Sequence, residues 1–390
     1  MPWKEVSAVD QRREFVRLAL LEGNNRRELC RRFGISPETG YRYLRRHAAG
    51  DRALEDRSRR PRSSPLQTAA AMENAVLGIR DAHPAWGARK IAAVIARGGA
   101  VPPVVSTIHA ILKRHGRIVE PDGGARATLR FEREVPNQLW QMDFKGWSRL
   151  TSGEPLHPLT VIDDHSRFAL CLDACADQTR QTVIASLERA FRTYGLPQAF
   201  FVDNGKPWGD SHDGNWTRLG VWLLKLGVDL IHSRPYHPQS RGKNERFHRS
   251  LDEEVLAMKP LHDFSDAQRA FDRWREIYNF ERPHGALDHH VPASRFRISS
   301  RPMPAKLPEP NYGPGDSVRS VSSTKAYVAF KGRNWKIPQA FCGERLAIRP
   351  LDRDGHYGVF FAAHHIATID LTEPQTVNHV SEQVSTISPD

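Results

Sequence analysis

The 390-residue sequence predicts a multidomain protein with two all-α units at the N-terminal end, an α/β domain in the middle and a small C-terminal β-barrel. Three observations predict this fold class. Apolar patterns with helical spacing that end at glycines fill the first third, and strand and helix patterns alternate through the middle. Short alternating runs with glycine-marked turns fill the last part. The chain is also too long for one small core.

Changes of pattern and composition set the predicted domain boundaries. The N-terminal part is divided into a helix-turn-helix DNA-binding domain at 1–49, a basic linker at 50–66, a second, winged-helix-like helix-turn-helix DNA-binding domain at 67–118 and a linker at 119–134. The α/β core with its trailing helices follows at 135–298. A Pro-rich linker at 299–315, a β-barrel at 316–370 and a disordered tail at 371–390 complete the chain.

The first helical domain shows the order helix, helix, turn, helix over residues 10–46. Its third helix is predicted to start with Ser36 as N-cap and Pro37 in the first helical position. We expect this helix to enter the DNA major groove with Thr39, Arg42, Tyr43, Arg45 and Arg46. The second domain repeats the plan in "HPAWGARKIAAVIARGG" and "VPPVVSTIHAILKRHG", with a helix cap near Ser106 or Thr107.

The net charge of +12 lies wholly in the first third of the chain. Residues 1–130 hold 25 Lys and Arg against 13 Asp and Glu, whereas residues 131–390 hold 32 of each class. A polyanion that binds the N-terminal third is the natural inference, and a solvated basic surface is the alternative.

Two classes of protein are disfavoured by the composition. No apolar run approaches the roughly 18 residues of a membrane span, and four scattered cysteines make neither a disulfide framework nor a zinc pattern. We therefore expect an intracellular, cytoplasmic protein with no membrane partner.

The middle domain is predicted to contain a mixed five-stranded sheet. The expected strands lie near 138–147, 156–163, 167–173, 199–203 and 228–232, and the expected helices at 178–194, 216–226, 239–258 and 264–280.

Three acidic residues of this domain lie on separate elements. Asp143 is predicted in mid-strand and buried among aromatics in "QLWQMDFKGW", and Asp203 ends a strand in "FVDNGKPWG". Glu245 lies early in the long helix, on the rim beside an apolar stripe formed by Phe247, Leu251, Val255 and Met258. Such acids suit a hard cation such as Mg²⁺, and two ions could support phosphodiester cleavage. A helix-cap or ion-pair role is the alternative for each acid.

Other acids are expected to be structural. Asp163 and Asp164 in "TVIDDHSRF" lie at a turn between two strands, where Asp commonly bonds its own backbone. Asp252, Glu253 and Glu254 follow Glu245 on a helix face of the kind that is often solvated.

The stretches "WQMDFKG", "VDNG" and "YHPQSRGKNERFHRSL" resemble the DDE transposases of bacterial insertion sequences, which share the ribonuclease-H-like catalytic core of retroviral integrases. The resemblance covers nearly the whole chain, and its third motif is the most specific. It implies that Asp143, Asp203 and Glu245 are the catalytic acids and that they hold two Mg²⁺ ions, with Mn²⁺ as a substitute.

The same resemblance implies roles for neighbouring residues. Asn204 would shape the loop over the metals, and His237, Gln239 and Lys243 would contact the substrate strand near its scissile phosphate. Arg249 and Arg241 are further expected DNA contacts, although relatives often carry a small amide at the position of Arg241.

Two departures from the family pattern stand out. The interval of 42 residues between Asp203 and Glu245 is longer than is usual in the superfamily, whereas Asp143 precedes Asp203 by 60 residues. The extra length is placed in "GDSHDGNWTRLG", which resembles a loop insertion. The chain also shows no His/Cys zinc-binding module at its N-terminal end, where the helix-turn-helix units stand instead.

The resemblance implies DNA transposition, in the bacterial cytoplasm and in association with the nucleoid when the protein is bound to DNA. The protein would bind the terminal inverted repeats of an insertion sequence, cut phosphodiester bonds at the element ends and join the 3′-hydroxyl ends to target DNA, as a homo-oligomer of two or more chains. Two alternatives stay open. One is a transposase-derived DNA-binding regulator that does not cut, and the other is a metal-dependent endonuclease that does not join.

Overall fold

The computed structural model describes residues 7–57, 67–118, 132–209, 216–233 and 242–372. The chain divides into two compact units, Met1–Gln67 and Thr68–Asp390, and each is described by itself. Within the described ranges we find no helix with the length and hydrophobicity that crossing a membrane requires.

The first unit is a three-helix bundle, as the sequence predicts. Its helices are α1 (Ala8–Ala19), α2 (Arg26–Arg32) and α3 (Pro37–Ala48). The side chain of the residue before each helix accepts a backbone N–H of the first turn, which satisfies a donor that the helix leaves open. The apolar core is formed by Phe15, Val16, Ala19, Leu29, Cys30 and Leu54.

A second group of three helices begins the other unit. These are α4 (Ala70–Ala82), α5 (Ala88–Arg97) and α6 (Val105–Arg114), packed around Ile91 and Ile108. The predicted side-chain cap at Ser106 or Thr107 is wrong, because both residues already lie inside α6. The cap position is occupied by Val104, which makes no side-chain hydrogen bond to the helix. Residues 67–118 contain no strand, so the expected winged-helix character is not found there.

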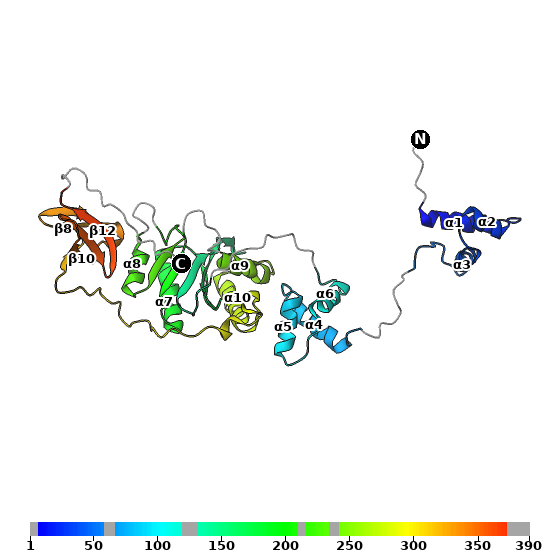
Figure 1. Cartoon of the computed structure of the whole chain (residues 1–390), viewed down its shortest axis with the longest axis horizontal. Helices are drawn as coiled ribbons and strands as arrows, with labels where there is room; N and C mark the ends of the chain where they lie inside the picture. The colour runs from blue at the N-terminus through cyan, green and yellow to red at the C-terminus, as the bar shows by residue number, and fades with distance from the viewer. Residues whose placement is uncertain (1–6, 58–66, 119–131, 210–215, 234–241, 373–390) are drawn as a thin grey trace, which may run out of the picture. The chain divides into compact units, whose positions relative to one another are not determined.

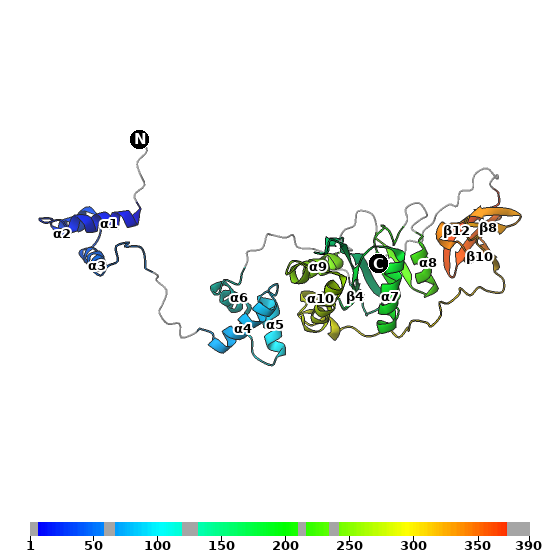
Figure 2. The same ribbon diagram turned by 180° about the vertical axis from the view of Figure 1, so that it is seen from behind.

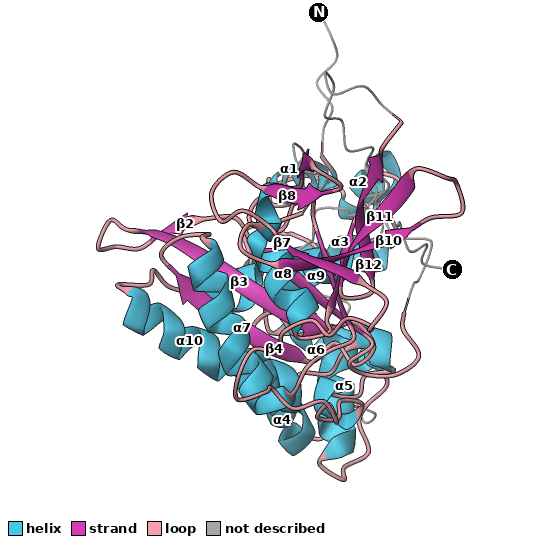
Figure 3. Ribbon diagram, turned by 90° about the vertical axis from the view of Figure 1, so that its left-hand side faces the viewer, coloured by secondary structure: helices cyan, strands magenta, loops and turns pink. Residues whose placement is uncertain are grey.

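The α/β core is built on one mixed sheet. Its strands are β1 (Leu139–Phe144), β2 (Ser148–Arg149), β3 (Pro155–Asp163), β4 (Ala169–Cys175), β5 (Ala199–Val202) and β6 (Asp229–His232). The order is β2-β3-β1-β5-β6, and β4 also pairs with β3. The central strands β1, β5 and β6 are parallel, whereas β3 is antiparallel to β1 and β4. The two-residue β2, beside the long β3 (Figure 3), is the one strand beyond the five predicted.

Helices cover both faces of this sheet (Figure 1). The helices are α7 (Arg180–Tyr194), α8 (Arg218–Lys225), α9 (Gly242–Leu251) and α10 (Phe264–Glu276). A π-helical turn extends α9 over Asp252–Leu256, and another extends α10 over Ile277–Glu281.

The two faces of the sheet bury different side chains of the same strands. Trp140 and Met142 pack with α7 and α8, whereas Ile162 of β3 packs with α9 and α10. Helix α10 runs beside β4, as the view from behind shows (Figure 2). Because successive side chains of a strand alternate between faces, Asp143 of β1 belongs to the face that α9 and α10 cover.

The C-terminal region forms two sheets rather than the predicted β-barrel. The strands are β7 (Ser317–Ser320), β8 (Tyr327–Phe330), β9 (Arg333–Lys336), β10 (Arg345–Pro350), β11 (His356–Phe361) and β12 (His364–Asp370). Four of them pair in the order β12-β11-β10-β7, and β8 pairs with β9 alone. A barrel closes only when the outer strands pair with each other, and β12 and β7 do not.

Candidate active site

Asp143 and Asp203 lie at the same end of two neighbouring parallel strands. Gln141 of β1 and Phe201 of β5 are the last pair of their ladder, and Asp143 and Asp203 each follow two residues later in the chain. Asp143 is still in β1, whereas Asp203 directly follows the end of β5. The prediction that these strands are adjacent and parallel is thus confirmed. Asp143 is not in mid-strand, however, but second to last in β1, and it is half-buried because β1 ends there.

Asp203 opens a loop that its own side chain helps to shape. Its Oδ1 accepts the backbone N–H of Gly205 at 2.9 Å, and a Cβ at Gly205 would lie only 3.3 Å from the same oxygen. Asn204 donates through Nδ2 to the carbonyl oxygen of Ser233, beyond β6, and His232 Nδ1 lies 2.9 Å from the carbonyl oxygen of Asp203. The described contacts of Asn204 therefore fix the loop, as its predicted shaping role requires.

Glu245 occupies the first turn of α9 and is exposed. The apolar stripe of this helix buries Phe247, Leu251 and Val255 against the sheet, as predicted. Met258 does not belong to the stripe, because the π-helical turn ends at Leu256, and Met258 is 54% exposed. The predicted start of the helix, at 239, lies outside the described residues.

Two polar contacts join α9 to the end of β1, and sequence reasoning missed both. His248 Nε2 lies 2.9 Å from Thr160 Oγ1, which in turn donates to the carbonyl oxygen of Asp143 at 2.9 Å. Lys145 Nζ lies 2.7 Å from Asp252 Oδ1, so Asp252 is not simply solvated. The signal was present, since His248 and Asp252 follow Glu245 at helical spacing.

The side chain of Lys243 is mostly buried, whereas a lysine that contacts DNA phosphate is expected to be exposed. Its ammonium pairs with the fully buried carboxylate of Asp164, which also accepts the backbone N–H of Arg133 at 2.8 Å and Gln141 Nε2 at 2.7 Å. Burial, which the charge of Asp164 only partly offsets, lowers the pKa of Lys243 to about 8. The predicted DNA contact is replaced by an internal ion pair, because a buried carboxylate needs a partner.

Asp163 has the structural role that the sequence predicts. Its carboxylate accepts the backbone N–H groups of Asn137 and Ser166 and the Ser166 hydroxyl, at 2.6 to 2.8 Å. These contacts fix the turn between β3 and β4. Burial still raises the pKa of Asp163, despite the hydrogen bonds that lower it.

The three predicted acids are only partly assembled as a metal site. Within the described part of the chain, no three His, Cys, Asp or Glu side chains gather closely enough to hold an ion. Asp143 and Asp203 nevertheless supply hard oxygen donors from neighbouring strands, which is the donor chemistry that Mg²⁺ prefers. The donor chemistry therefore fits the cation, and Glu245 in the first turn of α9 stays the predicted third carboxylate.

The predicted DNA contacts of α3 separate into two groups. Arg42 and Arg45 are exposed, as a DNA contact requires. Arg46 instead pairs with Asp51 at 2.7 Å and donates to the carbonyl oxygen of Glu55, while Tyr43 packs on the apolar core. Thr39 accepts the hydroxyl of the cap residue Ser36 at 3.0 Å.

Four predicted DNA contacts remain near α9. Arg249 is exposed on this helix. His237, Gln239 and Arg241 lie outside the described residues. None of the four is contradicted, and all stay predictions.

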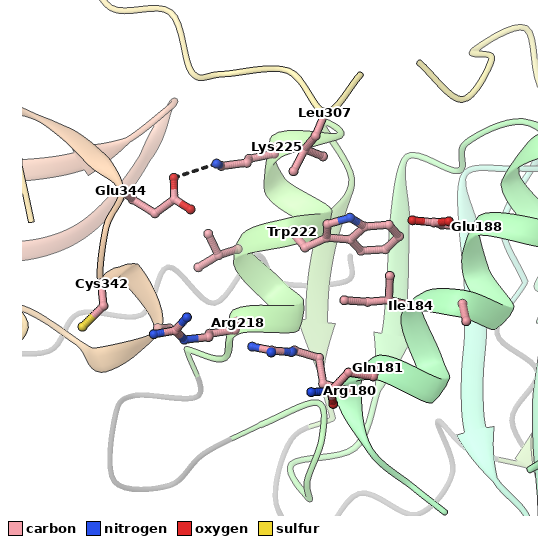
Figure 4. A pocket seen from close by; sticks show the side chains of 13 residues that line it. Arg180, Gln181, Ile184, Glu188, Arg218, Trp222, Lys225, Leu307, Cys342 and Glu344 are labelled. Atoms are coloured by element: carbon pink, nitrogen blue, oxygen red, sulfur yellow. Dashed lines mark ion pairs between the residues drawn. The ribbon is translucent and has the colours of Figure 1, made fainter. Parts of the chain in front are cut away.

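A groove begins beside the Asp203 loop. Its first part, of about 470 Å³, is lined by Lys206, Pro207 and the N-terminal turns of α7 and α8, and its second part, of about 440 Å³, continues along these helices to the C-terminal sheets. Arg180 and Arg218 line both parts, and Figure 4 shows them at the end of the second part away from the Lys225–Glu344 ion pair.

Three cations line this end of the groove, and the described part of the chain supplies no carboxylate partner for them. Among the described residues, no Asp or Glu lies within ion-pair distance of Lys206, Arg180 or Arg218. Lys206 and Arg218 are exposed and Arg180 is half-buried. The groove can therefore receive an anionic ligand such as a phosphodiester backbone.

Family models match the chain along most of its length. Two models described as an integrase core domain match residues 133–238 and 226–292, and an IS481 family transposase C-terminal domain matches 316–377. A helix-turn-helix domain matches 11–62 and a homeodomain-like domain matches 39–112.

Similar sequences come from insertion elements and retroviruses. An uncharacterized 31.7 kDa protein of insertion element IS407 of Burkholderia multivorans is 28% identical over 228 residues, which are 55% of this chain and 76% of that protein. An uncharacterized 39.2 kDa protein of insertion element IS476 of Xanthomonas euvesicatoria is 26% identical over 46% of this chain and 50% of that protein. The Gag-Pro-Pol polyprotein of Simian retrovirus SRV-2 is 32% identical over 30% of this chain, but only 6% of the polyprotein is matched.

Solved structures with a similar core are retroviral. A simian T-cell lymphotropic virus intasome structure aligns over 74% of this chain and 96% of its own chain, with 16% identity and a TM-score of 0.36. The catalytic core domain of BIV integrase aligns over 40% of this chain and 92% of its own, with 22% identity and a TM-score of 0.32. The family and insertion-element matches together support a DDE transposase of a bacterial insertion sequence, of the retroviral-integrase superfamily.

Proposed function

We propose that this protein is the transposase that cuts and joins the ends of its own insertion element, with Asp143, Asp203 and Glu245 as the catalytic acids. The observation that carries the proposal is that Asp143 and Asp203 lie at the same end of two adjacent parallel strands, inside a segment that matches the integrase core. Oxygen donors so placed can hold divalent cations, which would polarise the scissile phosphate and lower the pKa of a bound nucleophile.

The proposed reaction consists of two phosphoryl transfers. Water first attacks the phosphorus at the element end, a P–O3′ bond breaks, and the element strand keeps a 3′-hydroxyl while the flanking strand keeps a 5′-phosphate. That hydroxyl then loses its proton and attacks a target phosphodiester, so that a new P–O bond forms and the target P–O3′ bond breaks. The leaving 3′ oxygen of the target takes up a proton and becomes a 3′-hydroxyl. Neither step requires a covalent bond to the protein.

The chain's own residues would position the DNA for both steps. Arg42 and Arg45 of α3 would read the terminal inverted repeat, because both are exposed on the third helix of the bundle. Lys206, Arg180 and Arg218 would bind the backbone of a DNA strand in the groove that begins beside the Asp203 loop. Synapsis of two ends would require at least two copies of the chain.

The test uses a labelled duplex that carries the inverted repeat flanking the gene, a supercoiled target plasmid and Mg²⁺ or Mn²⁺. We expect joined products from the natural chain and none from Asp203→Asn. The asparagine can still accept the Gly205 N–H, so this variant should keep the loop. Asp272→Asn, which changes an exposed acid of α10, is the matched control and should join normally.

Three outcomes would contradict the proposal in different ways. Cut but unjoined duplex indicates the endonuclease alternative. Binding without cutting indicates the regulator alternative. Full cleavage by Asp203→Asn would show that the proposed catalytic acids do not take part in the reaction.

A further inference from the structure

Three polar residues are regularly spaced along one side of α9 and the π-helical turn that follows it. Glu245, His248 and Asp252 follow the i, i+3, i+7 spacing, so they lie along one side of the helix. Two of them are fixed: His248 by Thr160 and Asp252 by Lys145. Glu245 lies one turn before His248 on the same side, toward the N-terminal end of α9.

The contact through Thr160 reaches the backbone of Asp143. Thr160 is the direct partner of Asp143 in the β1–β3 ladder, and its hydroxyl donates to the Asp143 carbonyl oxygen at 2.9 Å. A hydroxyl has one proton to donate, so Thr160 Oγ1 must accept from His248 Nε2–H, also at 2.9 Å.

The imidazole suits this role because it stays neutral. Burial, reinforced by the charge of Lys145, lowers the pKa of His248 to about 4. At neutral pH the ring therefore carries one proton, which the hydrogen bond to Thr160 places on Nε2.

These directional contacts restrict small movements of α9 that its apolar packing permits. Phe247 and Leu251 hold the helix against the sheet, but apolar contact is non-directional and permits small sliding and rotation. A hydrogen bond loses strength steeply when its distance or angle changes. The hydrogen bonds from His248 to Thr160 and from Thr160 to the Asp143 carbonyl oxygen thus fix the position of α9 relative to Asp143.

We propose that His248 and Thr160 are positioning residues that hold Glu245 at its working level above Asp143, with the Lys145–Asp252 ion pair as a second fixing point. The inference rests on the proposed function, since it assigns Glu245 to the metal-binding acids. It concerns the chain's affinity for the ion and not the chemistry itself.

The test measures Mn²⁺ binding to the full chain, without DNA, from the electron paramagnetic resonance signal of free Mn²⁺. Thr160→Val keeps the size of the side chain and removes the hydroxyl, and it should weaken Mn²⁺ binding about 10-fold, as loss of an outer hydrogen bond to a metal ligand commonly does. Thr160→Ser restores the hydroxyl and should bind as the natural chain does. His248→Leu breaks the same relay from the helix side and should match Thr160→Val.

A second background separates positioning from a general loss of stability. In Glu245→Gln the third carboxylate is gone, so adding Thr160→Val should cause no further loss of Mn²⁺ affinity. An equal loss in both backgrounds, or undiminished binding by Thr160→Val and His248→Leu, would overturn the inference. A natural chain whose Mn²⁺ affinity is unchanged by Asp203→Asn would instead overturn the proposed function, which makes the two failures distinguishable.

Discussion

Single charged residues in this chain take their roles from burial more than from type. Lys243 and Arg46 resemble phosphate contacts in sequence, yet one neutralises the buried Asp164 and the other pairs with Asp51. Arg42, Arg45 and Arg249 have the same charge and remain exposed. A sequence pattern shows that a cationic residue is present, but the carboxylate that pairs with it is set by the fold.

The buried His284 gives a prediction at this scale. It is 6% exposed, and its Nδ1 accepts the backbone N–H of Ala286 at 3.2 Å. Burial, followed by the charge of Arg282, lowers the pKa of His284 to about 3. The unfolded chain, with an ordinary histidine pKa near 6.5, therefore binds more protons below pH 6.5. Stability should fall as the pH drops from 6.5 toward 3.

The expected size follows from linkage. Between pH 7 and pH 5 the free energy of unfolding should fall by about 2 kcal/mol through this one group. Urea unfolding followed by tryptophan fluorescence at both pH values measures it. His284→Leu should respond to pH less than the natural chain by about this amount, while the contribution of His248, whose pKa is also lowered, should stay. His109→Leu removes an exposed imidazole and should keep the natural response. An identical pH response in the natural chain and His284→Leu would refute the assignment.

The helices and strands of the core show how local signals place an element and tertiary contacts finish it. The sequence patterns placed β1, β3, β5 and α7 within a few residues of their observed bounds, because alternation and helical spacing follow from which face is buried. The end of the helix after Glu245 was misplaced, since a π-helical turn depends on the packing around it. Barrel closure failed for a similar reason, because it depends on pairing between strands far apart in sequence.

Gly195, which ends α7, supports a prediction at the scale of the element. Its backbone has φ 75° and ψ −174°, a conformation that only glycine adopts readily. A Cβ there would lie 2.7 Å from the Arg301 carbonyl oxygen. We expect Gly195→Ala to lower the free energy of unfolding by at least about 2 kcal/mol.

Calorimetry of the intact chain measures this loss on the core transition. Gly220→Ala is the matched control, because Gly220 lies within α8 and an added Cβ would meet its nearest neighbours at an ordinary 3.6 Å. That variant should be neutral or slightly stabilising. Equal melting temperatures for the two variants would show that α7 can end without the glycine conformation.

At the scale of the whole molecule, sequence and structure agree on the order of helical, α/β and β-rich parts, and the structure adds a basic groove to the predicted DNA contacts. The basic excess of residues 1–130 predicts the polyanion partner from composition alone. The groove beside the Asp203 loop could not be foreseen, because Lys206, Arg180 and Arg218 come from three segments that only the fold brings together. The adjacency of the β1 and β5 strands was foreseeable, and with it the placing of two acids.

The groove yields a prediction about salt. Lys206→Glu combined with Arg218→Glu should weaken binding of duplex DNA and lower the slope of log affinity against log salt by about 1 to 2, since each lost phosphate contact removes about 0.9. Fluorescence anisotropy over a salt series measures the slope. Arg273→Glu, on the exposed side of α10, should leave the slope close to that of the natural chain. An unchanged slope in the double variant would exclude the groove from the DNA path.

The register of β1 and β5 has a consequence for the resting protein. The shared ladder brings the two carboxylates to the same end of the sheet, and like charges that lie near each other repel. A doubly charged ion bound between them would turn this repulsion into attraction. Under the proposed function, binding of such an ion should therefore make the whole core harder to melt.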